Sequence, residues 1–173
     1  MDSPDTPPRV SADRLRTFVS QVFEKVGLTT DEARILGELI VAADLRGTDT
    51  HGVFRLPLYV RRIKAGGINL RPNIRIVEER ASTALVDGDN AMGHLIMRFA
   101  AHTAIAKAKE TGVGWVGARM SNHAGPAAVY AMMPLAHDMI GLYFAVGSNN
   151  HLPPTGSAEA LLGTNPIAVG RKC

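Results

Sequence analysis

Cysteine is almost absent from this chain of 173 residues, in which Cys173 is the one cysteine. A single thiol excludes an internal disulfide framework and a zinc site built on cysteine ligands. No apolar run is long enough to span a membrane, and the first residues are polar and proline-rich rather than signal-like. We therefore expect a cytoplasmic protein with no membrane partner.

Aromatic side chains and charge of one sign are also scarce. Aromatic residues make up 5% of the chain, and the net charge of +3 comes from basic residues that are mixed with acidic ones. This pattern excludes the basic and aromatic footprint of a nucleic-acid-binding protein. The chain contains neither a GxGxxG motif nor a Walker loop. No pair of histidines has the helical spacing, with a carboxylate, that metal sites use, so we expect no metal.

Hydrophobic periodicity divides the chain into a helical part and a mixed part. We expect a disordered tail over residues 1–10 and a helical N-terminal segment over residues 11–70. Ser11 is a good helix N-cap, and residues 29–32 form a capping box. A third helix is predicted from about Phe54 to Lys64.

Residues 71–173 alternate between strand-like and helical patterns, which predicts an α/β domain. The helices are expected at 93–110, with Phe99 facing inward, and at 126–137, where Pro134 should break the last turn. His94 and His102 are expected at the surface or the edge of the core. Strands are predicted at 74–78, 84–88, 113–118, 140–146 and 167–169, of which 113–118 and 140–146 are expected to be buried.

The stretch from Arg46 to Tyr59 gathers several groups that can carry out chemistry. It contains the hydroxyl of Thr50, the imidazole of His51, the guanidinium of Arg55 and the phenol of Tyr59. At a helix N-terminus the imidazole would be held neutral, and the arrangement suits acid/base work on a small carboxylate substrate. The alternative is that Thr50 and His51 cap a helix and Arg55 is a solvated charge.

Two further polar segments follow strands, where α/β proteins bind ligands. His123, in the segment Ser121–Gly125, is a second candidate for acid/base work; the alternative is a loop histidine that is hydrogen-bonded to the backbone. The turn Gly163–Pro166 offers backbone N–H groups and a hydroxyl to an anion. On residues alone, the chain is an α/β protein with two histidine-bearing loops.

Three segments together resemble those of the malate/L-lactate dehydrogenase family: Arg46–Tyr59, Ser121–Gly125 and Gly163–Ala168. This NAD(P)-dependent family also includes ureidoglycolate and sulfolactate dehydrogenases and cyclic imino-acid reductases. The resemblance implies a mixed α/β nucleotide-binding domain of non-Rossmann type, with NAD or NADP as cofactor. It also implies hydride transfer between NAD(P)H and a small 2-oxo or 2-hydroxy acid, or a related imine, in a homodimer.

The resemblance further implies roles for single residues. His51 and His123 are the acid/base candidates, members of the family differ over which one exchanges the proton, and Thr50 supplies a hydroxyl that orients the histidine. Arg55 and Tyr59 would meet the substrate carboxylate or the cofactor phosphate. The implied cofactor-binding residues are His123, Ala124, Gly125, Ser148, Gly163, Thr164 and Asn165.

Family members are much longer than this chain, so residues 71–173 would be the first, incomplete part of the NAD(P)-binding domain. We expect the N-terminal half of such a dehydrogenase, with weak or no activity of its own. Two alternatives stay open. One is a truncated non-catalytic remnant or interaction module of that fold, and the other is a cyclic imino-acid reductase.

Overall fold

The computed structural model of the protein describes residues 9–147 and 150–172. The chain divides into two compact units, Met1–Leu70 and Arg71–Cys173. The first is helical and the second combines helices with two small sheets, so the predicted mixed α/β class is confirmed. Among the helices of the described residues, none has the length and apolar character needed to cross a membrane.

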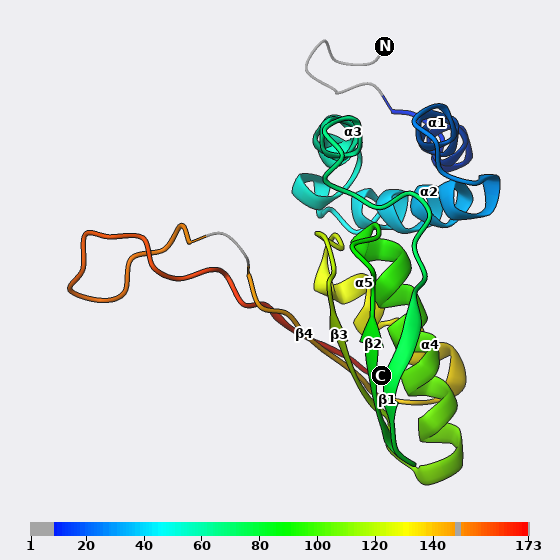
Figure 1. Ribbon diagram of the computed structural model, residues 1–173, viewed down its shortest axis with the longest axis vertical. Coiled ribbons are helices and arrows are strands. Elements are labelled where there is room, and N and C mark those ends of the chain that lie inside the picture. Colours follow the sequence, from blue (N-terminus) through cyan, green and yellow to red (C-terminus); the bar gives the residue numbers. More distant parts are fainter. Residues whose placement is uncertain (1–8, 148–149, 173) are drawn as a thin grey trace, which may run out of the picture. The chain divides into compact units, whose positions relative to one another are not determined.

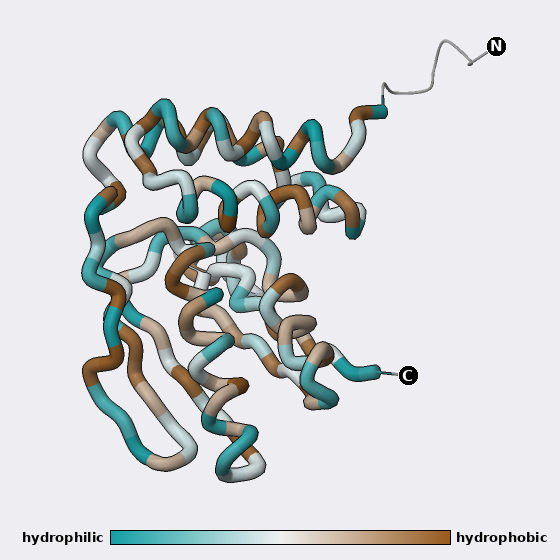
Figure 2. The backbone as a smooth tube through the Cα atoms, turned by 90° about the vertical axis from the view of Figure 1, so that its right-hand side faces the viewer, coloured by the Kyte–Doolittle hydropathy of each residue, from teal (hydrophilic) through white to brown (hydrophobic). Residues whose placement is uncertain are grey.

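The first unit begins with two helices whose starts follow the predicted caps. Ser11 accepts a hydrogen bond from the backbone of Arg14 at the start of the first helix, and Thr29 and Glu32 form a complete capping box at the start of the second. In Figure 2, hydrophobic and hydrophilic residues alternate along the first helix, as expected where one face is buried. The helical elements of the unit are α1 (Ala12–Lys25), α2 (Thr30–Asp44), η1 (Asp49–His51), η2 (Val53–Arg55) and α3 (Leu56–Lys64).

Burial of one face of each helix makes the core of this unit, where Phe23 of α1, Leu36 and Ile40 of α2 and Tyr59 of α3 are almost fully buried. The third helix, predicted from about Phe54 to Lys64, is present and ends at Lys64. Two short 3-10 turns, η1 and η2, precede α3, which begins only at Leu56.

The second unit contains a three-stranded sheet in the order β1 (Arg75–Glu79), β2 (Thr83–Asp87), β3 (Trp115–Arg119). β1 and β2 are antiparallel, whereas β2 and β3 are parallel and are joined through helix α4 (Gly93–Thr111). Figure 1 shows α4 lying along the sheet. The core cluster of this unit consists of Val86, Ala91, Ile96 and Ala100, with Ile74, Ile76, Met97, Val116 and Ala118 packed against it.

A second sheet is a two-stranded antiparallel ribbon of β4 (Gly141–Phe144) and β5 (Ile167–Gly170). Helix α5 (Ala127–Ala131) packs against both strands and gives way to the 3-10 helix η3 (Met133–His137), which confirms the expected break near Pro134. Residues 150–166 between the strands extend away from the ribbon in Figure 1.

Four burial predictions in the second unit were wrong. The segment 113–118, expected to be a buried strand, contains no buried residue, and Val113 and Trp115 are 60% and 58% exposed. The segment 140–146 is not a buried strand, because its large apolar side chains are exposed on the side of the ribbon that α5 does not cover. Phe99 is exposed, since Ile96 and Ala100 form the stripe of α4 that faces the sheet. His94 is fully buried, because the start of α4 lies directly under the backbone of residues 122–123.

Candidate functional site

Thr50, His51 and Arg55 form one hydrogen-bonded cluster in the first unit. The Thr50 hydroxyl lies 3.0 Å from Nδ1 of His51, and Arg55 Nε donates to the backbone carbonyl of Thr50 at 2.7 Å. The turns η1 and η2 make this possible, because they fold the chain back within six residues and bring Arg55 to the histidine. The structure thus brings three of the predicted site residues together.

The imidazole of His51 is held in its neutral form. Partial burial lowers its pKa from the ordinary value near 6.5, and the positive charge of Arg55 lowers it further. A neutral imidazole can accept a proton, and a hydroxyl on Nδ1 fixes the orientation of the ring. These are the requirements for a general base.

A residue that the sequence analysis missed, Asp44, holds this cluster in place. Its Oδ2 accepts a hydrogen bond from the backbone of Val53 at 3.0 Å. Its carboxylate also packs so closely on Gly52 that a Cβ at this position would collide with it. Burial raises the pKa of Asp44 above its usual value, an effect that the Val53 hydrogen bond opposes. An acidic residue in the last turn of a helix is unfavourable for the helix dipole, and this is the signal that could have identified it.

Tyr59, the fourth predicted site residue of this stretch, is buried. It is 2% exposed, in the core of the first unit. Burial raises the pKa of its phenol, and Arg55 and Arg62 lower it to a smaller extent. The role of Tyr59 in substrate binding stays a prediction from the family resemblance.

In the second unit, Asn122 fixes the loop that carries His123. The side-chain amide nitrogen of Asn122 donates to the backbone carbonyls of Asn90 and Ala91, both at 3.0 Å, and lies 2.9 Å from Oδ1 of Asn90. The backbone of Asn90 in turn donates to Met120. The loops that follow β2 and β3 are therefore joined, and His123 extends from this joined pair.

The His123 side chain is exposed. Hydrogen bonds also hold the residues that follow it in the loop, Ala124 and Gly125. The backbone of Gly125 donates to Nδ1 of His123 at 3.3 Å, and the hydroxyl of the buried Tyr130 donates to the carbonyl of Ala124. A ring nitrogen that accepts a hydrogen bond carries no proton, so the neutral ring carries its proton on Nε2. In this tautomer Nε2 is the donor of the His123 ring.

His94 lies beneath this loop, at the start of α4. Burial lowers the pKa of His94 to about 3, and electrostatic repulsion from His123 contributes a smaller part. His94 is therefore uncharged at neutral pH. His94 lies near the predicted site residue His123, although the sequence pattern predicted a position at the surface or the edge of the core.

The predicted cofactor residues Gly163, Thr164 and Asn165 lie at the base of the segment between β4 and β5. Gly163 packs backbone to backbone on Gly147, where a Cβ on Gly163 would lie 2.8 Å from the carbonyl oxygen of Gly147. Asn165 Oδ1 accepts a hydrogen bond from the backbone of Gly147 at 2.8 Å, and the Thr164 side chain is exposed. Ser148, the remaining cofactor candidate, lies outside the described residues.

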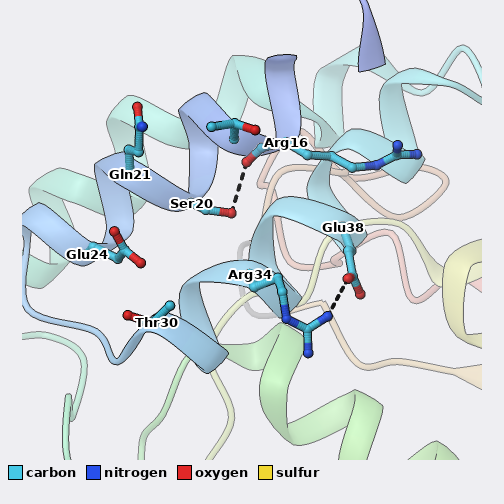
Figure 3. A pocket seen from close by; sticks show the side chains of 8 residues that line it. Arg16, Ser20, Gln21, Glu24, Thr30, Arg34 and Glu38 are labelled. Atoms are coloured by element: carbon cyan, nitrogen blue, oxygen red, sulfur yellow. Dashed lines mark hydrogen bonds and ion pairs between the residues drawn. The ribbon is translucent and has the colours of Figure 1, made fainter. Parts of the chain in front are cut away.

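A surface hollow lies elsewhere in the first unit, between α1 and α2 (Figure 3). Its walls carry the hydrogen bond from Ser20 to the Arg16 carbonyl and the ion pair of Arg34 with Glu38. None of the predicted site residues lines it. Within residues 9–147 and 150–172, no group of three His, Cys, Asp or Glu side chains has the spacing to hold a metal ion.

Comparison with known proteins shows the family to which the chain belongs. The family model for malate/L-lactate dehydrogenases matches residues 10–172. This chain belongs to the malate/L-lactate dehydrogenase family. Among its relatives in the family is the malate dehydrogenase of Pyrococcus horikoshii, which is 46% identical over 161 residues, or 93% of this chain and 44% of the relative.

Solved structures of the family have the same fold. The structure of the Pyrococcus horikoshii malate dehydrogenase matches with a TM-score of 0.91 at 45% identity, over 95% of this chain and 47% of that one. The sulfolactate dehydrogenase of Methanocaldococcus jannaschii gives a TM-score of 0.89 at 37% identity, over 94% and 47%. A delta1-piperideine-2-carboxylate reductase from Pseudomonas syringae gives 0.86 at 26%, over 95% and 49%. The chain spans about half the length of the family members that it matches.

Proposed function

We propose that this chain supplies the histidine-bearing loops of an oxidoreductase that transfers a hydride between NAD(P)H and a small 2-oxo or 2-hydroxy acid. Family membership supports the proposal, as do relatives named malate dehydrogenase and L-sulfolactate dehydrogenase. The observation that carries it is the cluster of Thr50, His51 and Arg55, in which a neutral imidazole contacts a hydroxyl and feels the charge of a nearby guanidinium.

Each group of the cluster has a place in this chemistry. During oxidation, the hydroxyl group of the substrate gives its proton to a neutral imidazole as its carbon gives up a hydride. During reduction, an imidazolium returns the proton to the oxo oxygen. The planar guanidinium of Arg55 suits the carboxylate of the substrate, because it can bind both oxygens. Both His51 and His123 are candidates for the proton transfer.

The backbone geometry of two loops of the second unit supports a role in binding a nicotinamide dinucleotide. Gly125 has a positive φ of 75° and Asn165 one of 41°, so both segments turn sharply and present backbone groups beside the His123 ring and the Thr164 hydroxyl. We propose that residues 123–125 and 163–165 bind the cofactor, NAD or NADP, which when bound accepts or supplies the hydride. Ser148, the homodimer and the cytoplasmic location stay predictions from the sequence.

A chimera tests the function directly. Residues 10–172 of this chain replace the matching half of the Pyrococcus horikoshii malate dehydrogenase, and NADH oxidation with oxaloacetate, pyruvate and glyoxylate is followed. We expect turnover, and a loss of about 10²- to 10⁴-fold in kcat for whichever of His51→Gln and His123→Gln removes the proton-exchanging group. His102→Gln, at an exposed position on α4, is the matched control. Full activity in both histidine variants would disprove the proposal.

Two measurements decide between the alternatives. The likeness to a delta1-piperideine-2-carboxylate reductase favours a cyclic imine as a second candidate substrate, so this imine belongs in the same substrate series. Titration of the chain itself with NADH and NADPH separates an enzyme half that still binds nicotinamide from a non-catalytic remnant, which would show no binding.

A further inference from the structure

One side of the β4–β5 ribbon carries four apolar side chains in two facing pairs. Leu142 lies opposite Val169 and Phe144 opposite Ile167, so all four point to the same side of the ribbon. Their exposed fractions range from 48% to 69%. Trp115 of β3 extends the row, because its ring centroid lies 5.6 Å from that of Phe144. We call these five residues the ribbon face.

The opposite side of the ribbon is already packed. A Cβ on Gly141 or on Gly170 would collide with the carbonyl oxygen of Ala131 in α5, so the helix lies directly on the strands. The ring of Tyr143 stacks on that of Tyr130 with 5.3 Å between centroids. The ribbon therefore has one side that α5 covers and one side that is open and apolar.

The ribbon is also short of strands. Within the described ranges β4 and β5 pair only with each other, and a ribbon of two strands is marginally stable in water. Its outer edges present backbone N–H and C=O groups that can pair with a further strand. A contiguous exposed apolar face beside open strand edges is typical of a surface that another polypeptide covers.

The lengths of the relatives indicate what covers this surface. The matched region is 93% of this chain but only 44% of the Pyrococcus horikoshii malate dehydrogenase, and the matched structures agree with a TM-score of 0.91. The family's fold therefore contains a further stretch at least as long as the matched region. That stretch must pack on some part of the matched region, and the ribbon face is an apolar surface suited to receive it.

We propose that the ribbon face is the docking surface for the other half of the family's fold, which buries Trp115, Leu142, Phe144, Ile167 and Val169 under apolar side chains of its own. The proposal rests on the family and on the packing of the ribbon, and it stands whether or not the chemistry proposed above is correct.

Co-expression of the tagged full chain with the unmatched part of the Pyrococcus horikoshii malate dehydrogenase tests this proposal. We expect a one-to-one complex in which the amides of residues 141–144 and 167–170 exchange with solvent much more slowly than in the chain alone. Leu142→Lys and Val169→Lys should each weaken the complex about tenfold or more, since each replaces a large apolar side chain in the proposed interface with a charge.

Leu45→Lys is the matched control, because Leu45 is 61% exposed on the first unit and the proposal gives it no role. Circular dichroism and thermal unfolding of each variant alone show whether the chain is still folded. The proposal is overturned if the folded chain captures no partner half, or if Leu45→Lys weakens capture as much as Leu142→Lys. It is also overturned if the chain alone forms dimers that protect both strands and that Leu142→Lys dissociates, because a second copy then covers the face.

Discussion

The surroundings of each histidine ring determine what that residue can do. His51, half-buried beside Arg55, has a lowered pKa and a hydroxyl on its ring, so it is suited to accept a proton. His123 is exposed, and its Nδ1 accepts a backbone hydrogen bond. His94 is sealed beneath the His123 loop, where charging its ring is strongly unfavourable. The three residue environments lead to three different expectations.

Acid should destabilise the protein through His94. Its folded pKa of about 3 lies far below the unfolded value near 6.5, so on acidification the unfolded chain takes up a proton before the folded chain does. The stability that neutral His94 contributes is complete above pH 6.5 and is lost as the pH falls toward 3. Between pH 7 and pH 5 this amounts to about 2 kcal/mol.

Urea unfolding at pH 7 and at pH 5 measures this loss for the natural chain and for His94→Gln. The variant should lose about 2 kcal/mol less over this interval, whatever its stability at pH 7. Phe18→Ala, which removes no titratable group from a half-exposed position, is the control and should keep the pH dependence of the natural chain. An unchanged pH dependence in His94→Gln would show that the buried ring is not responsible.

At the scale of elements, close contacts between backbones position the candidate loops. Helix α4 begins at Gly93, and a Cβ there would collide with the carbonyl oxygen of Asn122 and lie 2.7 Å from backbone atoms of His123. The side chain of Asn122 then joins the same loop to Asn90 and Ala91. The start of one helix and the loop after a neighbouring strand therefore form a single packed structure.

Gly93→Ala should destabilise the second unit by roughly 1–3 kcal/mol, because the added methyl group must displace the backbone that carries His123. Urea unfolding measures the loss, and the NMR signal of the His123 ring should shift. In Gly117→Ala the new Cβ would meet Leu85 at an ordinary 3.5 Å, so this variant should change stability much less. Equal effects of the two substitutions would contradict the packing described.

At the scale of the whole molecule, each of the two units has a core of its own. Phe23 is fully buried in the first unit, whereas Phe18 on the same helix is 52% exposed. Val86 and Ile96 are fully buried in the core of the second unit. Burial of apolar side chains such as these is the main favourable contribution to the folding of each unit.

Phe23→Ala should lower the free energy of unfolding by about 3–5 kcal/mol, because it removes a buried aromatic ring and leaves a cavity. Phe18→Ala removes the same atoms from a partly solvated position and should cost clearly less. Chemical unfolding followed by the circular dichroism of the helices measures both. A smaller loss for Phe23→Ala than for Phe18→Ala would contradict the assignment of the core.

Short-range patterns predicted much of this fold. The caps at Ser11 and Thr29 and the break near Pro134 depend on neighbours along the chain, and the structure confirms them. The burial of His94 and the exposure of residues 140–146 were predicted wrongly. Burial at both places depends on which distant segments of the chain pack against them, and hydrophobic periodicity does not contain this information.

In the candidate site, too, contacts between sequence neighbours could be predicted, whereas contacts between distant residues could not. The order of Thr50, His51 and Arg55 along the chain was enough to predict their grouping, because turns of a few residues bring them together. The roles of Asp44 and Asn122 became visible only in the tertiary structure, since their partners are 9 to 32 residues away in the chain. The sequence by itself determined most of the helices and the family resemblance, because these follow from local hydrogen bonding and from the order of motifs. The tertiary structure decided which histidine ring is buried, which loops are hydrogen-bonded to each other and which apolar face stays open, because solvent exclusion depends on packing between distant segments.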